Sequence, residues 1–336
     1  MDDDILNKAV NQIKEIKMTT SEKERVLKEI FDLHKTEPRH SIHSPYIGAF
    51  FSKISLRHFS YVGVAICLVL LLTGGVVSAQ ASLPGSTLYP IKVGVVEPLR
   101  AALIFSPVKK IKYETKLATE RIIEAEMLAS RDELNESHVE KLNELLENHT
   151  NAFNSAVYSM RAKGSPSPYI DDDFIIGFEA RMNAHARVLD LISERENLGK
   201  DIADSEFTSK HTKLSQTARE KAATVANNLR NNKDHNDKTI EERYKKRKDA
   251  VRSLIDSTTK DIAGIRSQAS PHGKKIADHT DTILNQAKQL LKEGEDKEKN
   301  GDAFDAYNKI LDSESSAKEA EIFLKAGLRL PDVPEH

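Results

Sequence analysis

The sequence contains no tryptophan, one cysteine and only 14 glycines among 336 residues. A single cysteine excludes an intrachain disulfide and any zinc site built on cysteine pairs. Scarce glycine and 6% aromatic residues disfavour enzymes with glycine-rich phosphate loops, whereas 30% charged residues suit long solvent-exposed helices. The formal net charge of −2 supplies no field that would attract nucleic acid. Composition therefore predicts an all-α protein that binds no nucleic acid.

Charged residues are also absent between His58 and Lys92, and residues 59–79 of this interval are strongly apolar. About 21 helical residues at 1.5 Å each span about 31 Å, which matches the hydrocarbon thickness of a bilayer. We therefore predict one transmembrane helix over residues 59–79, in contact with membrane lipid.

Two properties of this apolar run leave its processing and orientation open. Ala79-Gln80-Ala81 has the small-x-small form of a cleavage site, and cleavage after Ala81 would release a soluble helical bundle. The long segment before the run favours an uncleaved anchor, because signal peptides begin with a short basic region. Flanking basic residues are slightly more numerous on the N-terminal side, which favours an N-terminus inside and an exported C-terminal part in the cell membrane.

Residues 1–36 predict a cytoplasmic hairpin of two amphipathic helices, joined by residues 37–58 as a linker to the span. Two short helices cannot bury both of their apolar stripes. We expect the hairpin to bind a cytoplasmic regulatory protein, to form a homo-oligomer or to pack on the membrane. The candidate partner-binding residues are Ile5, Leu6, Val10, Ile13, Val26, Leu27, Ile30 and Phe31.

The segment of residues 80–105 carries the most specific string of the chain. Its motif residues are Leu83, Pro84, Gly85, Leu88, Tyr89, Pro90 and Lys92. Pro84-Gly85 predicts a type II turn, and Pro90 predicts the first turn of a membrane-surface helix that breaks near Pro98. We expect Tyr89 and Lys92 to reach the lipid headgroups.

This string resembles a bacterial juxtamembrane domain family of unassigned function. The resemblance covers roughly residues 79–127 and rests on LPG-x-x-LYP-x-K, on Glu97 with Arg100, and on L-A-x-x-R-x-x-E at residues 117–124. Members of that family are typically single-pass proteins with an exported C-terminal part, and some carry anti-sigma-factor-like segments inside the cell. The resemblance implies an inside N-terminus and no activity. Because the His-x3-Cys-x2-Cys motif of zinc-containing anti-sigma domains is missing here, sigma-factor capture would be metal-free.

The remaining sequence predicts helices that pack as a bundle or as coiled-coil-like hairpins. Residues 106–199 form a predicted proximal bundle, residues 200–327 a distal bundle and residues 328–336 a loose tail. Apolar residues alternate by four and three to make a narrow seam in the first helix, at Ile111, Thr115, Ala118, Ile122, Ala125 and Ala129. A capping box at Ser137 predicts the next helix start, and Pro271-His272-Gly273 and residues 294–301 predict breaks.

Histidines lie at or beside the seam positions of these helices, among them His149 and His185. Protonation near pH 6 would place charge in an apolar interface and loosen the bundle, which suggests a pH-sensitive seam. The alternative is that a neighbouring side chain satisfies each histidine.

The motifs of catalytic and cofactor sites are missing from the sequence, which has no phosphate loop, no His-Glu-x-x-His and no nucleophile elbow. We therefore predict a non-enzymatic single-pass membrane protein without cofactor or metal. A transmembrane regulator or sensor resembling a metal-free anti-sigma protein is the leading interpretation. A structural or adhesive cell-envelope protein with an exported helical stalk, or a secreted bundle released by cleavage, is the alternative.

Overall fold

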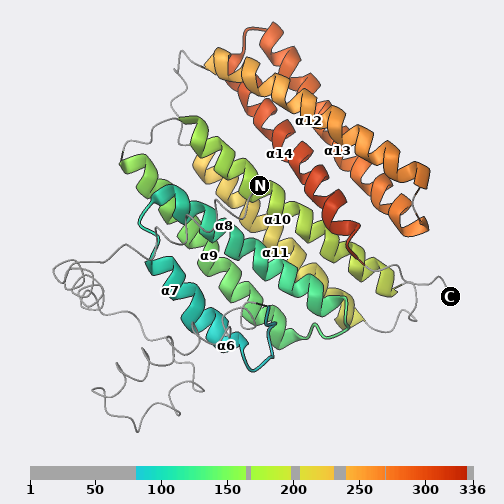
Figure 1. The fold of residues 1–336 in the computed structure, drawn as a ribbon. Coiled ribbons are helices and arrows are strands. Elements are labelled where there is room, and N and C mark those ends of the chain that lie inside the picture. Colours follow the sequence, from blue (N-terminus) through green and yellow to red (C-terminus); the bar gives the residue numbers. More distant parts are fainter. Residues whose placement is uncertain (1–80, 164–167, 198–204, 231–239, 269, 331–336) are drawn as a thin grey trace, which may run out of the picture. The chain divides into compact units, whose positions relative to one another are not determined.

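The computed structural model describes residues 81–163, 168–197, 205–230, 240–268 and 270–330, and all regular elements in these ranges are helices (Figure 1). The all-α prediction is confirmed for this part of the chain. The predicted hairpin at 1–36, the linker at 37–58 and the span at 59–79 lie outside the described residues. Among the described helices, none combines the length and the apolar character needed to cross a bilayer.

The described chain begins with a continuous helical stretch made of α6 (Tyr89–Ile91), a π-helical turn η1 (Lys92–Val96) and α7 (Glu97–Ala102). Two long helices follow, α8 (Pro107–Ala129) and α9 (Glu136–Ala162), and then α10 (Pro168–Asn197) and α11 (Ser205–Arg230). The chain ends with α12 (Ile240–Gln268), α13 (Pro271–Lys299) and α14 (Ala303–Gly327).

Helices α8, α9, α10 and α11 share one apolar core. The predicted seam of α8 is buried at Ile111, Ala118, Ile122, Ala125 and Ala129, whereas Thr115 is half-buried. Phe153 of α9 stacks on Phe178 of α10 with 4.5 Å between the ring centroids. Helix α11, from the predicted distal range, packs against α9 and α10 and contributes Ala218, Ala222 and Val225 to this core.

Helix α14 packs against α10, which belongs to the core just described, and against the pair α12 and α13. It therefore lies between α10 and that pair (Figure 1). Every position from Ser313 to Ala317 is buried, so α14 is covered on several of its sides. Gly294 of α13 lets this helix approach closely, because a Cβ there would lie 3.3 Å from the Ala306 carbonyl oxygen. The break predicted over residues 294–301 is present only at the end of that range, between Lys299 and Ala303, and the close packing explains why Gly294 lies inside α13.

The boundaries of two helices differ by one or two residues from the prediction. Helix α9 begins at Glu136 with Asn135 as its cap, because the Asn135 side chain accepts a hydrogen bond from the His138 N–H, so the capping box at Ser137 is wrong. The break predicted at Pro271-His272-Gly273 is present but lies just before these residues, since α12 ends at Gln268 and Pro271 begins α13. Ser270 caps α13 at the Gly273 N–H. Both caps satisfy amide groups that the first helical turn leaves unpaired.

The predicted break near Pro98 is absent, and the helical path continues through it. Proline has no N–H, and its ring crowds the carbonyl four residues earlier. Here the π-turn widens the helix just before Pro98, with the Glu97 N–H bonded to the Lys92 carbonyl five residues back. The wider turn accommodates the proline ring.

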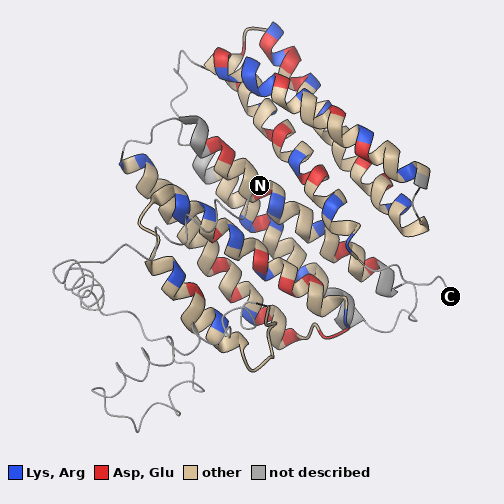
Figure 2. Cartoon of the chain, in the orientation of Figure 1, with Lys and Arg blue, Asp and Glu red and all other residues tan. Residues whose placement is uncertain are grey.

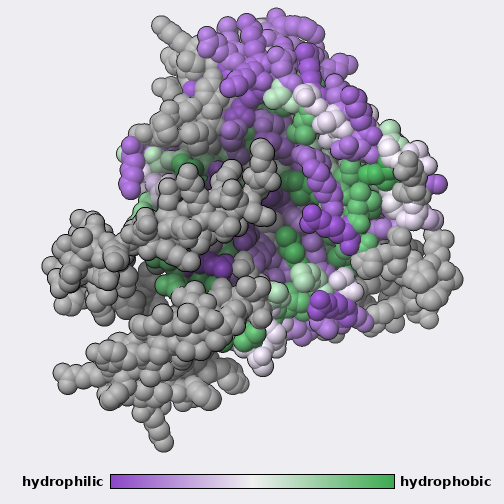
Figure 3. Space-filling view, viewed as in Figure 1, coloured by the Kyte–Doolittle hydropathy of each residue, from purple (hydrophilic) through white to green (hydrophobic). Residues whose placement is uncertain are grey.

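Charged residues are spread unevenly over the described helices. Figure 2 shows many of them on α12 and α13, and few on the stretch α6–η1–α7. The space-filling view correspondingly shows a mainly hydrophilic surface over α12 and α13 (Figure 3). The two regions therefore present different surfaces to their surroundings.

Candidate functional site

The motif string opens with a hydrogen-bonded turn over residues 83–86. The Ser86 N–H donates to the Leu83 carbonyl at 3.0 Å, and Gly85 has a φ of +89°. A positive φ at the third turn position is what a type II turn requires of glycine, so the predicted turn is present. A Cβ at Gly85 would also lie 2.9 Å from Nε2 of His138, so the turn packs closely on the start of α9.

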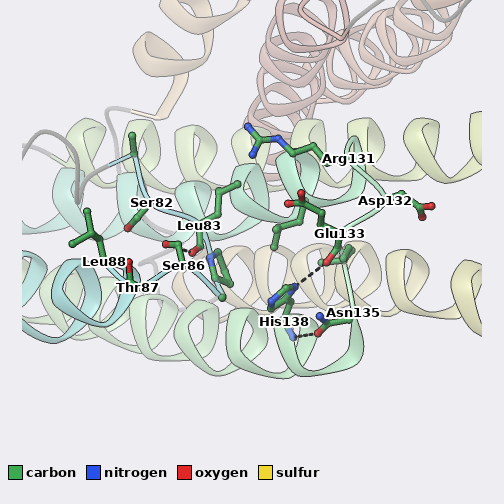
Figure 4. A pocket seen from close by; sticks show the side chains of 15 residues that line it. Ser82, Leu83, Ser86, Thr87, Leu88, Arg131, Asp132, Glu133, Asn135 and His138 are labelled. Atoms are coloured by element: carbon green, nitrogen blue, oxygen red, sulfur yellow. Dashed lines mark hydrogen bonds between the residues drawn. The ribbon is translucent and has the colours of Figure 1, made fainter.

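An open pocket of about 930 Å³ lies between this turn and the loop that joins α8 to α9 (Figure 4). The loop side includes Arg131, Asp132 and Glu133, and Asp132 has a positive φ of 58°. His138 is held by its own surroundings, since its Nδ1 lies 3.0 Å from the Glu133 carbonyl oxygen. The lining combines apolar side chains such as Leu128 and Leu134 with hydroxyls, one imidazole and solvent-exposed charges, which suits a contact between chain segments better than catalysis.

Beyond the turn, buried charged and phenolic side chains join the motif string to α8. We call this set the juxtamembrane cluster, after the position that the sequence predicts for its motif string; it consists of Tyr89, Lys92, Glu97, Glu120, Arg121 and Glu124. Nζ of Lys92 donates to Oε1 of Glu124 at 2.6 Å and lies 2.7 Å from Glu120. The Tyr89 hydroxyl donates to the other oxygen of Glu124 at 2.8 Å.

Arg121 lies at the centre of the juxtamembrane cluster and is fully buried. One guanidinium nitrogen donates to the Tyr89 hydroxyl at 2.8 Å, and the other donates to Glu97 at 2.5 Å. These bonds link residues 24 and 32 positions apart in the sequence. The guanidinium therefore holds both ends of the stretch 89–97 on one point of α8.

The π-turn explains why Glu97 faces the same way as Lys92. Five residues separate the two, and in a regular α-helix that spacing would turn Glu97 away from the face that carries Lys92. The extra residue of the π-turn places Glu97 one turn after Lys92, as its bond to the Lys92 carbonyl shows. Both side chains consequently reach α8.

Burial and charge act against each other in the cluster. Burial alone would lower the pKa of Arg121, but Glu124, Tyr89 and Glu97 outweigh it and raise that pKa, so the guanidinium stays charged. Burial raises the pKa of Glu124, and the cations of Arg121 and Lys92 limit the rise. Burial also raises the pKa of Tyr89, which keeps its hydroxyl protonated as a donor. The cluster is thus a paired structural network whose members all have partners.

Each of the two candidate pH-sensitive histidines contacts a carboxylate. Nδ1 of His149 lies 2.9 Å from Glu114, and Nδ1 of His185 lies 2.8 Å from Glu126. Burial would raise the pKa of Glu114, but hydrogen bonds from His149 and Lys110 outweigh it and lower that pKa. Burial raises the pKa of Glu126, and its hydrogen bond with His185 limits the rise. A neighbouring carboxylate thus pairs with Nδ1 of each histidine, as the alternative expects, whereas Nε2 of His149 is buried without a hydrogen-bond partner among the described residues.

A second buried arginine network joins α10, α12 and α14. We call it the α14 cluster; it consists of Asp172, Asp173, Arg247, Tyr307 and Glu314. Arg247 donates to Glu314 at 2.6 Å, to Asp173 at 2.9 Å and to the Tyr307 hydroxyl at 3.2 Å. Tyr307 in turn donates to Asp172 at 2.6 Å.

The structure brings part of the predicted site residues together and corrects the role of two. Tyr89 and Lys92 are buried against α8 and do not extend toward headgroups, because Arg121, Glu120 and Glu124 pair with them. Leu83 and Leu88 are half-buried, Pro84 is buried and Pro90 is exposed. The candidate residues between Ile5 and Phe31 lie outside the described residues.

The sequence analysis did not identify the residues of α8 that pair with the motif string as site residues. Arg121 and Glu124 were visible as the R-x-x-E of the resemblance, but their pairing with Tyr89 and Lys92 was not. The signal was a pair of charges within the predicted seam helix. Within the described ranges, no group of three His, Cys, Asp or Glu side chains is arranged to hold a metal ion.

Comparison with known proteins places this geometry in a family. A sequence family described as a domain of unknown function, DUF5667, matches residues 81–261, which is more than half of the 336 residues. The matched range begins at the turn and contains every residue of the juxtamembrane cluster. No curated protein and no solved structure matches the chain.

Proposed function

Since this chain belongs to the DUF5667 family of domains of unknown function, we propose that its shared part is a coupling domain, which joins a membrane span to a helical bundle. In this proposal the protein is a non-enzymatic, single-pass bacterial membrane protein with its bundle exported. The observation that carries the proposal is the juxtamembrane cluster, which begins at Tyr89, at the end of the uncharged interval of the sequence.

Rigidity is the property that supports coupling. A flexible tether would need no buried charges, and burying unpaired charges would cost several kcal/mol. Here the hydrogen-bonded turn packs on the start of α9, and the π-turn and Arg121 fix residues 89–97 on α8. A displacement of α8 would therefore move the end of the span with it.

A transmembrane regulator uses such a coupling, and we favour that role. Its inner element would be the predicted hairpin of residues 1–36, which would bind a cytoplasmic regulatory protein in the manner of a metal-free anti-sigma protein. A structural or adhesive envelope protein is the alternative, and in that case the binding surface lies on the exported helices. A released bundle, the third candidate, would lack residues 1–81.

The first experiment is a crosslinking pull-down from native membranes with a tag at the N-terminus. Three chains are compared: the natural sequence, the double variant Ile13→Asp with Ile30→Asp, and Arg121→Lys. The regulator role predicts full-length protein with a specific cytoplasmic partner that the double variant loses. Arg121→Lys keeps the charge of the cluster but removes the forked contact to Tyr89 and Glu97.

The outcomes separate the candidates. Partner capture that Arg121→Lys alters would support coupling across the membrane, because this residue lies far along the chain from residues 1–36. Full-length protein without any partner would favour the envelope role. Recovery of the tag on a short fragment would indicate cleavage near Ala81.

A further inference from the structure

The helical stretch α6–η1–α7 carries three charged residues, of which Arg100 is half-buried and the other two face inward. Lys92 and Glu97 are buried against α8, together with Tyr89 and Val96. The exposed positions between 90 and 105 are all apolar: Pro90, Gly94, Pro98, Leu99, Ala102, Leu103 and Phe105. We call these seven residues the outer face. A helix that faces water normally shows the opposite pattern.

Exposure on the outer face is large where the side chains are large. Leu99 is 41% exposed, Leu103 62% and Phe105 78%. They are three of the six large apolar side chains that are exposed among the described residues, and they fall within seven consecutive positions. Scattered exposed apolar residues need no explanation, but a contiguous set of this kind marks a surface that something covers.

The position of the outer face along the chain indicates what covers it. The sequence is uncharged from residue 59 to residue 91, and the first charges after it, Lys92 and Glu97, are turned inward by the cluster. From residue 81 to Phe105, therefore, no acidic residue is exposed. Few residues separate Ala79 from the described chain, so the domain starts beside the bilayer if residues 59–79 span it.

Cationic side chains follow the outer face. Lys109, Lys112 and Lys116 are exposed on the first turns of α8, directly after Phe105. Lysines near a bilayer surface attract anionic lipid headgroups, each by about 1 kcal/mol. An apolar strip bordered by lysines is the pattern of helices that lie in the plane of a membrane.

We propose that the stretch α6–η1–α7 lies flat in the membrane interface, with the outer face in the acyl-chain boundary and the α8 lysines at anionic headgroups. This inference rests on the span of the proposed function and adds the orientation of the exported bundle. Because α8 packs on the inward side of the stretch, the bundle would lie along the bilayer and not stand as a stalk.

The chain offers a direct test because it has no tryptophan. Phe105→Trp places the only indole on the outer face, and Lys260→Trp places it at an exposed position of α12 as a matched control. Each full-length variant is reconstituted into vesicles of phosphatidylcholine and phosphatidylglycerol, with and without brominated acyl chains. We expect the indole emission of the Phe105→Trp variant to be blue-shifted, and to be quenched several-fold more strongly than that of the Lys260→Trp variant.

Each result decides the inference. If the incorporated Phe105→Trp variant emits as an indole in water and resists quenching, the inference is overturned while the span stays intact. A blue shift in this variant that depends on protein density, without quenching by brominated lipid, overturns it in favour of a second copy on the outer face. Failure of both variants to float with the vesicles refutes the span and, with it, the membrane orientation. In the Phe105→Trp background, Leu99→Ser with Leu103→Ser should reduce the quenching.

Discussion

The juxtamembrane cluster and the α14 cluster use the same chemistry in different settings. Each has one buried arginine that binds a tyrosine hydroxyl and two carboxylates. Arg121 reaches partners no more than 32 positions away, whereas Arg247 bonds residues 60, 67 and 74 positions away. The first therefore fastens a short segment to its neighbour, and the second closes the tertiary fold.

The two clusters also differ in how completely they exclude water. The side chain of Arg121 is fully buried, and its partners Glu97 and Glu124 are nearly so. In the α14 cluster Asp173 is 60% exposed, and Glu314 has a second cation in Lys318. Removal of the arginine should consequently cost more in the first cluster than in the second.

Arg121→Met is the strongest test of this comparison. It leaves Glu97 and Glu124 buried with fewer partners, so we expect the free energy of unfolding to fall by about 3–5 kcal/mol. Urea unfolding of the detergent-solubilised chain, followed by circular dichroism, measures the change. Arg131→Met, at an exposed position of the pocket, is the matched control and should be near neutral. A small loss for Arg121→Met would mean that the cluster does not fasten the segment.

Arg247→Met should cost less, about 2–3 kcal/mol, because water and Lys318 still reach two of the abandoned carboxylates. The same unfolding measurement applies. If Arg247→Met lowered the free energy of unfolding more than Arg121→Met, the burial of the arginine would not determine how much each cluster contributes to stability, and the comparison would fail.

Gly85→Ala sharpens the comparison, because it strains the turn with positive φ that leads into the juxtamembrane cluster and leaves the α14 cluster untouched. The added Cβ would meet Nε2 of His138 at 2.9 Å, and the φ of +89° would be strained for alanine. We expect a loss of about 1–2 kcal/mol in unfolding free energy. Adding His138→Ala should relieve the contact but not the backbone strain; complete recovery in the double variant would show that strain contributes nothing.

The smallest effects concern the two Glu–His pairs, and their pH dependences should have opposite signs. Glu126 has a raised pKa, so its contribution favours the folded state at low pH and is lost as pH rises through the raised value. Glu114 has a lowered pKa, so its contribution is present at neutral pH and is lost on acidification. Stability of Glu126→Gln relative to the natural chain should therefore rise with pH, and that of Glu114→Gln should fall.

Urea midpoints measured from about pH 3 to about pH 8 would reveal these slopes. Slopes of the same sign would contradict the assignment. Replacing His149 and His185 with glutamine belongs to the same series, since an unchanged pH profile of stability in that double variant would remove the pH-sensitive seam.

The sequence predicts local features well and distant pairings poorly. The seam of α8 follows from spacing alone, because apolar residues every three or four positions have one face to bury. The turn at Gly85 follows from the residue types that a positive φ tolerates. The pairing of Lys92 with Glu124 does not follow, because a lysine beside an apolar run has two stable environments and only the packing of α8 selects one.

The predicted helix breaks at glycine and proline are wrong where tertiary packing outweighs the low helix propensity of these residues. Gly294 costs α13 some helix propensity, but close contact with α14 requires it. Pro98 would break a regular helix, yet the preceding π-turn accepts it. In both cases the deciding neighbour is set by tertiary structure, which residue preferences do not encode.

The π-turn at residues 92–96 finally has an evolutionary consequence. A π-turn forms when one residue is inserted into an α-helix and the residues on both sides of the insertion keep their tertiary contacts, because the extra residue is then taken up in one wider turn. A relative of this chain that lacks one residue between Lys92 and Glu97 should therefore have a regular helix with the same pairs to Arg121 and Glu124. A relative that lacks two residues there would lose either the pair of Lys92 with Glu124 or the pair of Glu97 with Arg121. Sequences with a gap of one residue should therefore keep glutamate at position 97, and sequences with a gap of two should carry other residues there.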